Sequence, residues 1–302
     1  MEREGFMKIQ KTLGLVAAPP TAFFDNDTID FTAIPPLAKH LHGEGVAGVF
    51  VNGTTGEGMS LSTGEREQTA EAWRAALPKG VKLFIHAGHN SHPDAIRMAA
   101  HAQRIGADAV AIIAPSFFKP AGVAGMVDWC APIAAAAPAL PFYFYHMPSM
   151  SGVNLSAARF LEAAAPRIPN MAGIKFTFEA MADYQEALEL DGGRFDVLWG
   201  RDEMLLAALA TGARGGVGST FNLATPLYLK LITSFDRGDL ATARALQAKA
   251  IAMINTMVAT GHFFVALKAM LKAKGVPMST RVRPPLVNPA AGSFAVPVVP
   301  AP

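Results

Sequence analysis

The chain has 302 residues, 51% of them hydrophobic, which is long enough for one large barrel or two smaller domains. Its 26 lysines and arginines nearly balance 24 aspartates and glutamates, and this scattered charge of +2 gives no basis for binding nucleic acid. The single cysteine, Cys130, excludes an intrachain disulfide, and prolines interrupt the apolar stretches before any could span a membrane, so we expect a cytoplasmic protein.

Short apolar runs alternate with amphipathic segments along the chain, always strand before helix. Strands are predicted at residues 13–18, 47–51, 82–87, 109–114, 141–146, 171–175, 195–199 and 215–219. Helices are predicted at residues 31–44, 63–77, 94–105, 121–136, 156–165, 180–190, 203–211 and 226–235. Ser62 and Glu65 have the spacing of a capping box at the start of the second helix. Two more helices, 240–259 and 261–274, have no strand partner.

Strands that are apolar throughout are typical of a parallel sheet covered on both faces. Eight strand–helix units predict an α/β fold of the (β/α)8 TIM-barrel type with a C-terminal helical extension. A doubly wound sheet is the alternative, but no glycine-rich dinucleotide fingerprint follows the first strand. The predicted organisation is an N-terminal arm (1–12), the barrel (13–235), C-terminal helices (236–289) and a flexible tail (290–302).

Lys175 ends the sixth predicted strand, the apolar run MAGIKF at residues 171–176. Burial makes the charged form of a lysine costly, so we expect an amine that loses its proton readily. A neutral amine is a nucleophile that can form a Schiff base with a carbonyl substrate.

Polar residues follow five of the predicted strands. In a parallel barrel the carboxyl ends of the strands form one face, where the active site lies. The residues expected there are Thr54, Thr55, Tyr145, Lys175, Thr177, Gly200, Asp202, Glu203, Gly218 and Ser219. A hydroxyl-lined cradle for a carboxylate, an amine for a carbonyl and a phenol as proton donor together predict a site for a 2-keto acid.

Four motifs carry a resemblance to a known family: GTTGE at 53–57, YHMP at 145–148, GIK at 173–175 and GST at 218–220. In this order they resemble the pyruvate-dependent class I aldolases, the family that includes N-acetylneuraminate lyase and dihydrodipicolinate synthase. The resemblance covers residues 13–275. It implies that Lys175 forms the imine, Tyr145 shuttles the proton, and Thr54 and Thr55 bind the pyruvate carboxylate. It also implies a homotetramer with no cofactor beyond the covalent imine.

Two positions indicate a branch of this family. The synthase branch binds a second carboxylate with an arginine two residues after the YHMP proline, and here Met150 stands there. The lyase branch carries Gly-x-Asp-Glu after the seventh strand, matched here by residues 200–203. The resemblance therefore implies reversible cleavage of N-acetylneuraminate to N-acetylmannosamine and pyruvate. The implied substrate-binding residues are Thr177, Gly200, Asp202, Glu203, Gly218 and Ser219.

One position departs from the family pattern. Many members place a tyrosine from the neighbouring subunit into the site after the fourth strand, and the match here is Phe117. Phenylalanine carries no proton, so proton transfer would fall to Tyr145, the substrate carboxylate or water.

Two other functions stay open. The chain could be another pyruvate-dependent aldolase or a dehydratase acting on a 2-keto-3-deoxy sugar acid, or a non-catalytic barrel that binds a keto acid as a sensor. His86, His89 and His92 are spaced along one loop but lack a companion carboxylate motif, so no metal site is expected. His146 is expected to pack or position rather than to act as a base.

Overall fold

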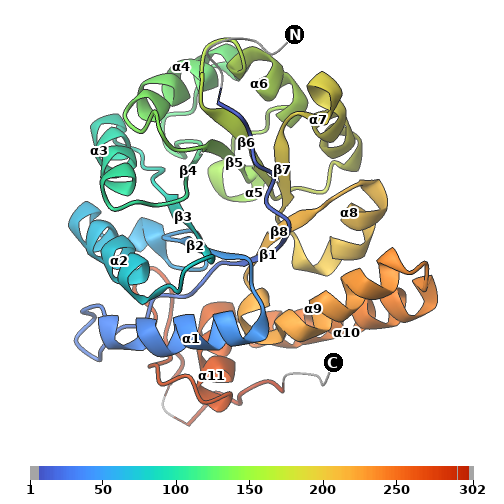
Figure 1. Ribbon diagram of the computed structural model, residues 1–302. Helices are drawn as coiled ribbons and strands as arrows, with labels where there is room; N and C mark the ends of the chain where they lie inside the picture. Colours follow the sequence, from blue (N-terminus) through green and yellow to red (C-terminus); the bar gives the residue numbers. More distant parts are fainter. Residues whose placement is uncertain (1–6, 291, 299–302) are drawn as a thin grey trace.

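The computed structural model describes residues 7–290 and 292–298, which form a closed barrel of strands inside a ring of helices (Figure 1). Within these residues, eight parallel strands follow one another around the barrel in chain order, and the first pairs with the last. The predicted (β/α)8 fold with C-terminal helices is confirmed, and the doubly wound alternative is wrong. Parts of the predicted arm and tail, residues 1–6, 291 and 299–302, lie outside the described residues.

Every predicted strand is present, with ends within one residue of the prediction. The strands are β1 (Gly14–Ala17), β2 (Gly48–Val51), β3 (Lys82–His86), β4 (Ala109–Ile113), β5 (Phe142–His146), β6 (Met171–Phe176), β7 (Asp196–Trp199) and β8 (Gly215–Gly218). Nearly all strand residues are buried, because side chains of one face fill the barrel and those of the other lie under the helices.

The helices between the strands form the outer ring. They are α1 (Ile34–Glu44), α2 (Thr63–Ala76), α3 (His92–Arg104), α4 (Gly122–Ala135), α5 (Pro148–Ser151), α6 (Ala157–Ala164), α7 (Met181–Gly193), α8 (Leu205–Thr211) and α9 (Phe221–Asp236). The predicted capping box of α2 is present. Glu65 N–H donates to Ser62 Oγ at 3.3 Å, and Ser62 N–H donates to Glu65 Oε2 at 2.8 Å.

Two helices differ from the prediction. The short α5 was not predicted, since four residues show no helical periodicity. Helix α9 begins at Phe221, five residues before the predicted start at Pro226. Proline favours the first turn of a helix, but here Ala224 has non-helical dihedral angles and lets Pro226 stand inside a kinked helix.

Two apolar cores lie on opposite sides of the sheet. The barrel interior contains Val16, Phe50, Phe84, Tyr143 and Leu198, all almost fully buried. A larger core lies between the sheet and the surrounding helices, and it includes Cys130, which is fully buried as a small hydrophobe. This packing holds the strand ends in place.

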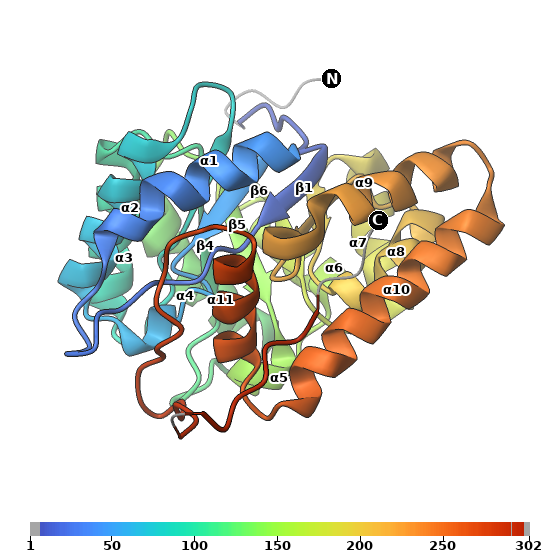
Figure 2. The same ribbon diagram turned by 90° about the horizontal axis from the view of Figure 1, so that it is seen from below.

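Two C-terminal helices, α10 (Leu240–Ala259) and α11 (Phe263–Ala273), complete the fold. Helix α10 packs along α9, and α11 contacts both. Helices α11 and α5 lie toward the end of the barrel at which the strands finish (Figure 2). In the described part of the chain, no single helix is long and apolar enough to cross a membrane; α10 and α11 meet those criteria only as a pair bent by 118°.

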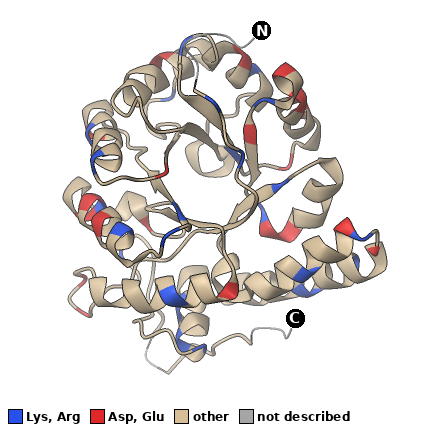
Figure 3. Cartoon of the chain, in the orientation of Figure 1, with Lys and Arg blue, Asp and Glu red and all other residues tan. Residues whose placement is uncertain are grey.

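Charged residues are distributed over the outer helices. Figure 3 shows lysines and arginines interspersed with aspartates and glutamates around the ring, while most of the barrel carries neither. The mixed pattern matches the near balance of charges in the sequence.

Candidate active site

Lys175 points into the barrel because of a register shift in β6. Phe142 of β5 pairs with Met171, but the next residue, Tyr143, pairs with Gly173, so Ala172 is an extra residue. A one-residue slip turns every later side chain of a strand to the opposite face. Lys175 therefore lies beside Tyr145 on the interior face, where its side chain is only 5% exposed.

Two aromatic rings enclose the Lys175 amine. Its Nζ lies 3.9 Å from the centroid of the Tyr145 ring and 4.3 Å from that of the Phe50 ring. The Lys175 amine is therefore sheltered from solvent and lies against the ring of Tyr145.

The Tyr145 hydroxyl lies between the Thr54 hydroxyl and the thioether of Met147. Its oxygen is 3.1 Å from Thr54 Oγ1, and the hydroxyl donates to Met147 Sδ at 2.9 Å. His86 packs edge-on against the Tyr145 ring at 5.7 Å and is itself buried, and burial lowers the pKa of His86 well below its usual value. The phenol is thus oriented from three sides.

Two hydroxyls from distant strand ends meet at the mouth of the barrel. Thr55 Oγ1 lies 2.6 Å from Ser219 Oγ, although the two residues are 164 positions apart in the chain. Together with Thr54 they form a cluster of hydroxyls close to Tyr145 and Lys175. We call Thr54 and Thr55 the cradle. A carboxylate can accept hydrogen bonds from such hydroxyls.

Asp202 is buried behind the loop after β8. Its Oδ2 accepts hydrogen bonds from the Thr220 backbone N–H at 2.7 Å and from Thr220 Oγ1 at 2.6 Å. Burial raises the pKa of Asp202 to about 6, against the opposite effect of the Thr220 hydrogen bonds. A Cβ on Gly218 would stand 2.1 Å from Asp202 Oδ1, so only glycine fits there.

Thr177 and Gly200 fit together at the ends of β6 and β7. The Thr177 hydroxyl is buried and makes no hydrogen bond with the described residues. A Cβ on Gly200 would lie 1.9 Å from that hydroxyl, so glycine is required for the close approach. A buried hydroxyl without a partner is costly, which favours a bound polar group at this position.

Glu203 is already paired. Its Oε1 accepts from Arg201 Nε at 3.1 Å and Nη2 at 2.8 Å, and Arg201 also pairs with Glu179. Glu203 and Asp202 therefore differ in setting, since one carboxylate is neutralised by an arginine and the other is held by neutral donors.

Phe117 lies outside this group of contacts. It is 76% exposed and packs edge-on against Phe118, which is 85% exposed, at a centroid distance of 4.9 Å. Its role at a neighbouring subunit stays a prediction. Among the described residues, no three histidine, cysteine or acidic side chains are grouped to hold a metal ion.

An open cavity of about 390 Å³ adjoins the cradle. Thr54 and His86 are among its lining residues, and Met59, Met150, Phe264 and Leu286 contribute apolar side chains to it. The cavity lies where α11 and the segment after it approach the strand ends.

Several site residues were assigned no role from the sequence. Phe50, Met147, Thr220 and Tyr228 all contact a predicted site residue or its partner. Met147 and Thr220 lie inside the YHMP and GST motifs, and Phe50 lies in β2 just before the GTTGE motif, so position alone could have found them. Tyr228 lies in α9 and has no such signal.

The chain is similar to known proteins over most of its length. A profile described as the Dihydrodipicolinate synthetase family matches residues 11–292. N-acetylneuraminate lyase from Mus musculus is 40% identical over 273 residues, covering 89% of this chain and 85% of that protein. Two solved structures are also similar. Proteus mirabilis N-acetylneuraminate lyase has a TM-score of 0.90 and 40% identity over 93% of this chain and 95% of its own. The enzyme from Aliivibrio salmonicida has a TM-score of 0.91 and 39% identity over 94% and 93%.

Proposed function

The chain belongs to the dihydrodipicolinate synthetase family, and on this premise we propose that it is a class I aldolase acting on sialic acid. It is a carbon–carbon lyase that cleaves N-acetylneuraminate reversibly to N-acetylmannosamine and pyruvate. The observation that carries the proposal is the sheltered Lys175 amine, 3.9 Å from the Tyr145 ring and beside the Thr54 hydroxyl that reaches Tyr145.

Imine formation is the first step of the proposed reaction. The open-chain keto acid places its carboxylate against Thr54 and Thr55, and the neutral Lys175 amine attacks the C2 carbonyl. Loss of water leaves a protonated imine, which accepts the electron pair released when C3–C4 breaks. No cofactor is needed for this step.

Proton transfer is assigned to Tyr145. Tyr145 gives its proton to the hydroxyl that leaves C2 as water during imine formation, and its oxygen then takes the proton of the C4 hydroxyl as the C3–C4 bond breaks, which releases N-acetylmannosamine as an aldehyde. Tyr145 passes this proton to C3 of the remaining enamine, and it regains a proton from the water that hydrolyses the imine to pyruvate and the free amine. Because Phe117 has no hydroxyl, Tyr145 carries this role without a second phenol.

The hydroxylated part of the substrate is assigned to the residues at the ends of β6, β7 and β8. Thr177 offers a buried hydroxyl without a partner, and Ser219 lies 2.6 Å from the cradle. Asp202 and Glu203 supply acceptors for sugar hydroxyls, while Gly200 and Gly218 let Thr177 and Asp202 approach the strand ends closely.

Trapping with pyruvate and borohydride tests the proposal. We expect one reduced pyruvate adduct per chain, located at Lys175 by peptide mapping, and none in Lys175→Ala. Lys82→Ala is the matched control, since Lys82 starts β3 at the opposite end of the barrel and should leave the adduct intact. An adduct that persists in Lys175→Ala contradicts the assignment.

One observation favours a shorter substrate as the second candidate. The pairing of Glu203 with Arg201 leaves fewer free acceptors for a long polyol tail. A 2-keto-3-deoxy sugar acid would then be the better substrate. Pyruvate release from N-acetylneuraminate against 2-keto-3-deoxygluconate separates the two, and faster release from the latter would favour the second candidate.

We further propose that the protein is a cytoplasmic homotetramer in which Phe117 contacts the neighbouring subunit. The exposed pair of Phe117 and Phe118 is an apolar surface of the kind that a protein contact covers. Light scattering of wild type and Phe117→Glu measures the mass of the assembly, and a wild-type monomer would contradict the proposed tetramer.

A further inference from the structure

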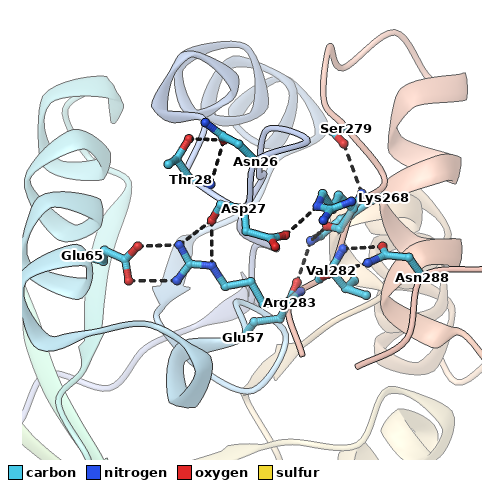
Figure 4. Close-up of polar contacts among 11 residues, drawn as sticks. Asn26, Asp27, Thr28, Glu57, Glu65, Lys268, Ser279, Val282, Arg283 and Asn288 are labelled. Atoms are coloured by element: carbon cyan, nitrogen blue, oxygen red, sulfur yellow. Dashed lines mark hydrogen bonds and ion pairs between the residues drawn. The ribbon is translucent and has the colours of Figure 1, made fainter. Parts of the chain in front are cut away.

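A fully buried ion pair links α11 to the loop after β2 that carries Thr54 and Thr55, which we call the cradle loop. Lys268 Nζ lies 2.6 Å from Glu57 Oε1, and the two side chains are 0% and 1% exposed. The residues are 211 positions apart, since Glu57 follows the cradle and Lys268 lies in α11. Figure 4 shows both side chains among polar contacts from the cradle loop, α2 and the segment after α11. Burial lowers the pKa of Lys268, and the Glu57 carboxylate opposes this effect.

Glu57 occupies a backbone conformation that its side chain does not favour. Its φ is +53°, in the left-handed region, where the Cβ of a non-glycine residue crowds the following carbonyl oxygen. Its N–H donates to the Thr54 carbonyl at 3.0 Å, so the conformation of Glu57 sets the turn that carries the cradle. Such a conformation persists when surrounding contacts over-determine it.

The segment after α11 supplies the other contacts of this carboxylate. Glu57 Oε2 accepts from the Arg283 N–H at 2.9 Å, and Lys268 also donates to the Arg281 carbonyl at 2.6 Å. The Arg283 side chain donates to the Ser60 carbonyl at 3.1 Å on the other side of the cradle loop. Both carboxylate oxygens of Glu57 are thus held by the C-terminal region.

We propose that Lys268 is a positioning residue for keto-acid binding, which acts through Glu57 on the turn that holds Thr54 and Thr55. Lys268 then affects substrate binding without touching the substrate. This inference rests on the proposed role of the cradle in binding the keto-acid carboxylate.

The test compares Lys268→Met with Lys274→Met. Lys274 lies one residue past the C-terminal end of α11 and pairs with Glu44 at 2.8 Å, so its loss removes an ion pair of the same region without touching the cradle loop. For Lys268→Met we expect at least about a tenfold rise in the pyruvate concentration that half-saturates borohydride trapping, and in KM. We expect kcat to change less, because Lys175 and Tyr145 keep their contacts. Lys274→Met should behave as wild type in both readouts.

A double variant separates positioning from simple stability. Replacing a buried ion pair by apolar residues often restores stability, so Lys268→Met with Glu57→Leu should recover the melting temperature. We expect the weakened pyruvate binding to remain, because leucine accepts no hydrogen bond from Arg283. Recovery of both the melting temperature and pyruvate binding would overturn the proposal and leave Lys268 only a structural role.

A milder variant serves if Lys268→Met does not fold. Glu57→Gln keeps the size of the side chain and removes its charge, and it should raise the half-saturating pyruvate concentration with little change in kcat. Unchanged half-saturation in a folded variant overturns the inference while the proposed function stands. Absence of any adduct in wild type would overturn both.

Discussion

At the scale of single residues, Lys175 and Asp202 lie in different settings. The Lys175 amine is sheltered between the rings of Phe50 and Tyr145, whereas Asp202 accepts hydrogen bonds from Thr220 and burial raises its pKa to about 6. The amine is thus enclosed by aromatic rings, and the carboxyl group is held by neutral donors.

Tyr145→Phe isolates the proton-transfer step. The substitution keeps the ring that faces Lys175 and removes only the hydroxyl that reaches Thr54 and Met147. We expect kcat to fall by about 10²–10⁴-fold with the imine still trapped by borohydride. Tyr143→Phe is the control, since that hydroxyl bonds Asp196 deeper in the barrel. An equal fall in kcat for both variants would contradict the specific role.

Asp202 predicts a pH dependence of substrate binding. With its pKa raised to about 6, the carboxylate becomes protonated as pH falls through 6 and loses acceptor strength. We expect KM for N-acetylneuraminate to rise below about pH 6 in wild type. Asp202→Asn should have a high KM without this pH dependence. The effect of Asp202 on the free energy of unfolding runs the other way with pH. The raised pKa stabilises the fold in full below pH 3.8, and this stabilisation is lost as pH rises through about 6.

At the scale of elements, the extra residue in β6 decides which face of the sheet Lys175 occupies. Gly173 takes part in this irregular register, and a Cβ there would stand 1.8 Å from the Asp196 carbonyl oxygen of β7. Only glycine lets β6 and β7 pair so closely while the strand shifts its register. The register shift in β6 therefore shapes the site as well as the barrel.

Gly173→Ala is expected to push β6 from β7. The new methyl group meets backbone rather than a flexible side chain, so the cost should be about 1–3 kcal/mol of unfolding free energy. Because Lys175 is two residues away, the rate of imine trapping should fall as well. Gly64→Ala, in α2 with open space around it, is the matched control. A folded Gly173→Ala protein with wild-type stability and trapping would contradict this account.

At the scale of the whole molecule, residues after α11 return to the second strand–helix unit. The Arg283 guanidinium contacts the Asp27 carbonyl, the Ser60 carbonyl and the Glu65 carboxylate, so it joins the segment after α11 to residue 27 and to residues 60–65. Figure 4 shows its contacts with Asp27 and Glu65. Glu65, the third residue of α2 and part of its capping box, is thereby tied to the segment after α11. The start of α2, the cradle loop and the segment after α11 form one connected polar cluster.

This cluster predicts a loss of stability in acid. The Arg283 hydrogen bond lowers the pKa of Glu65 from 4.5 to about 2. A lowered carboxyl pKa stabilises the fold above pH 4.5, and the stabilisation is lost as pH falls toward 2. Urea unfolding between pH 5 and 2 should show this loss in wild type and less of it in Glu65→Gln. An identical pH slope in the two proteins would contradict the prediction.

The sequence by itself determined the order of strands and helices, the capping box of α2, and the lysine, tyrosine and threonines at the strand ends. These are local signals, since apolar periodicity and motif spacing depend on near neighbours in the chain. They were sufficient for the barrel and for its active face.

The tertiary structure alone decided how those residues meet. The register shift before Lys175, the pairing of Thr55 with Ser219, and the ion pair of Lys268 with Glu57 join positions that no local pattern connects. Barrel closure brings the strand ends together, and packing density then selects which side chains touch. Contacts across 164 or 211 residues exist only after that closure, so no local pattern in the sequence predicts them.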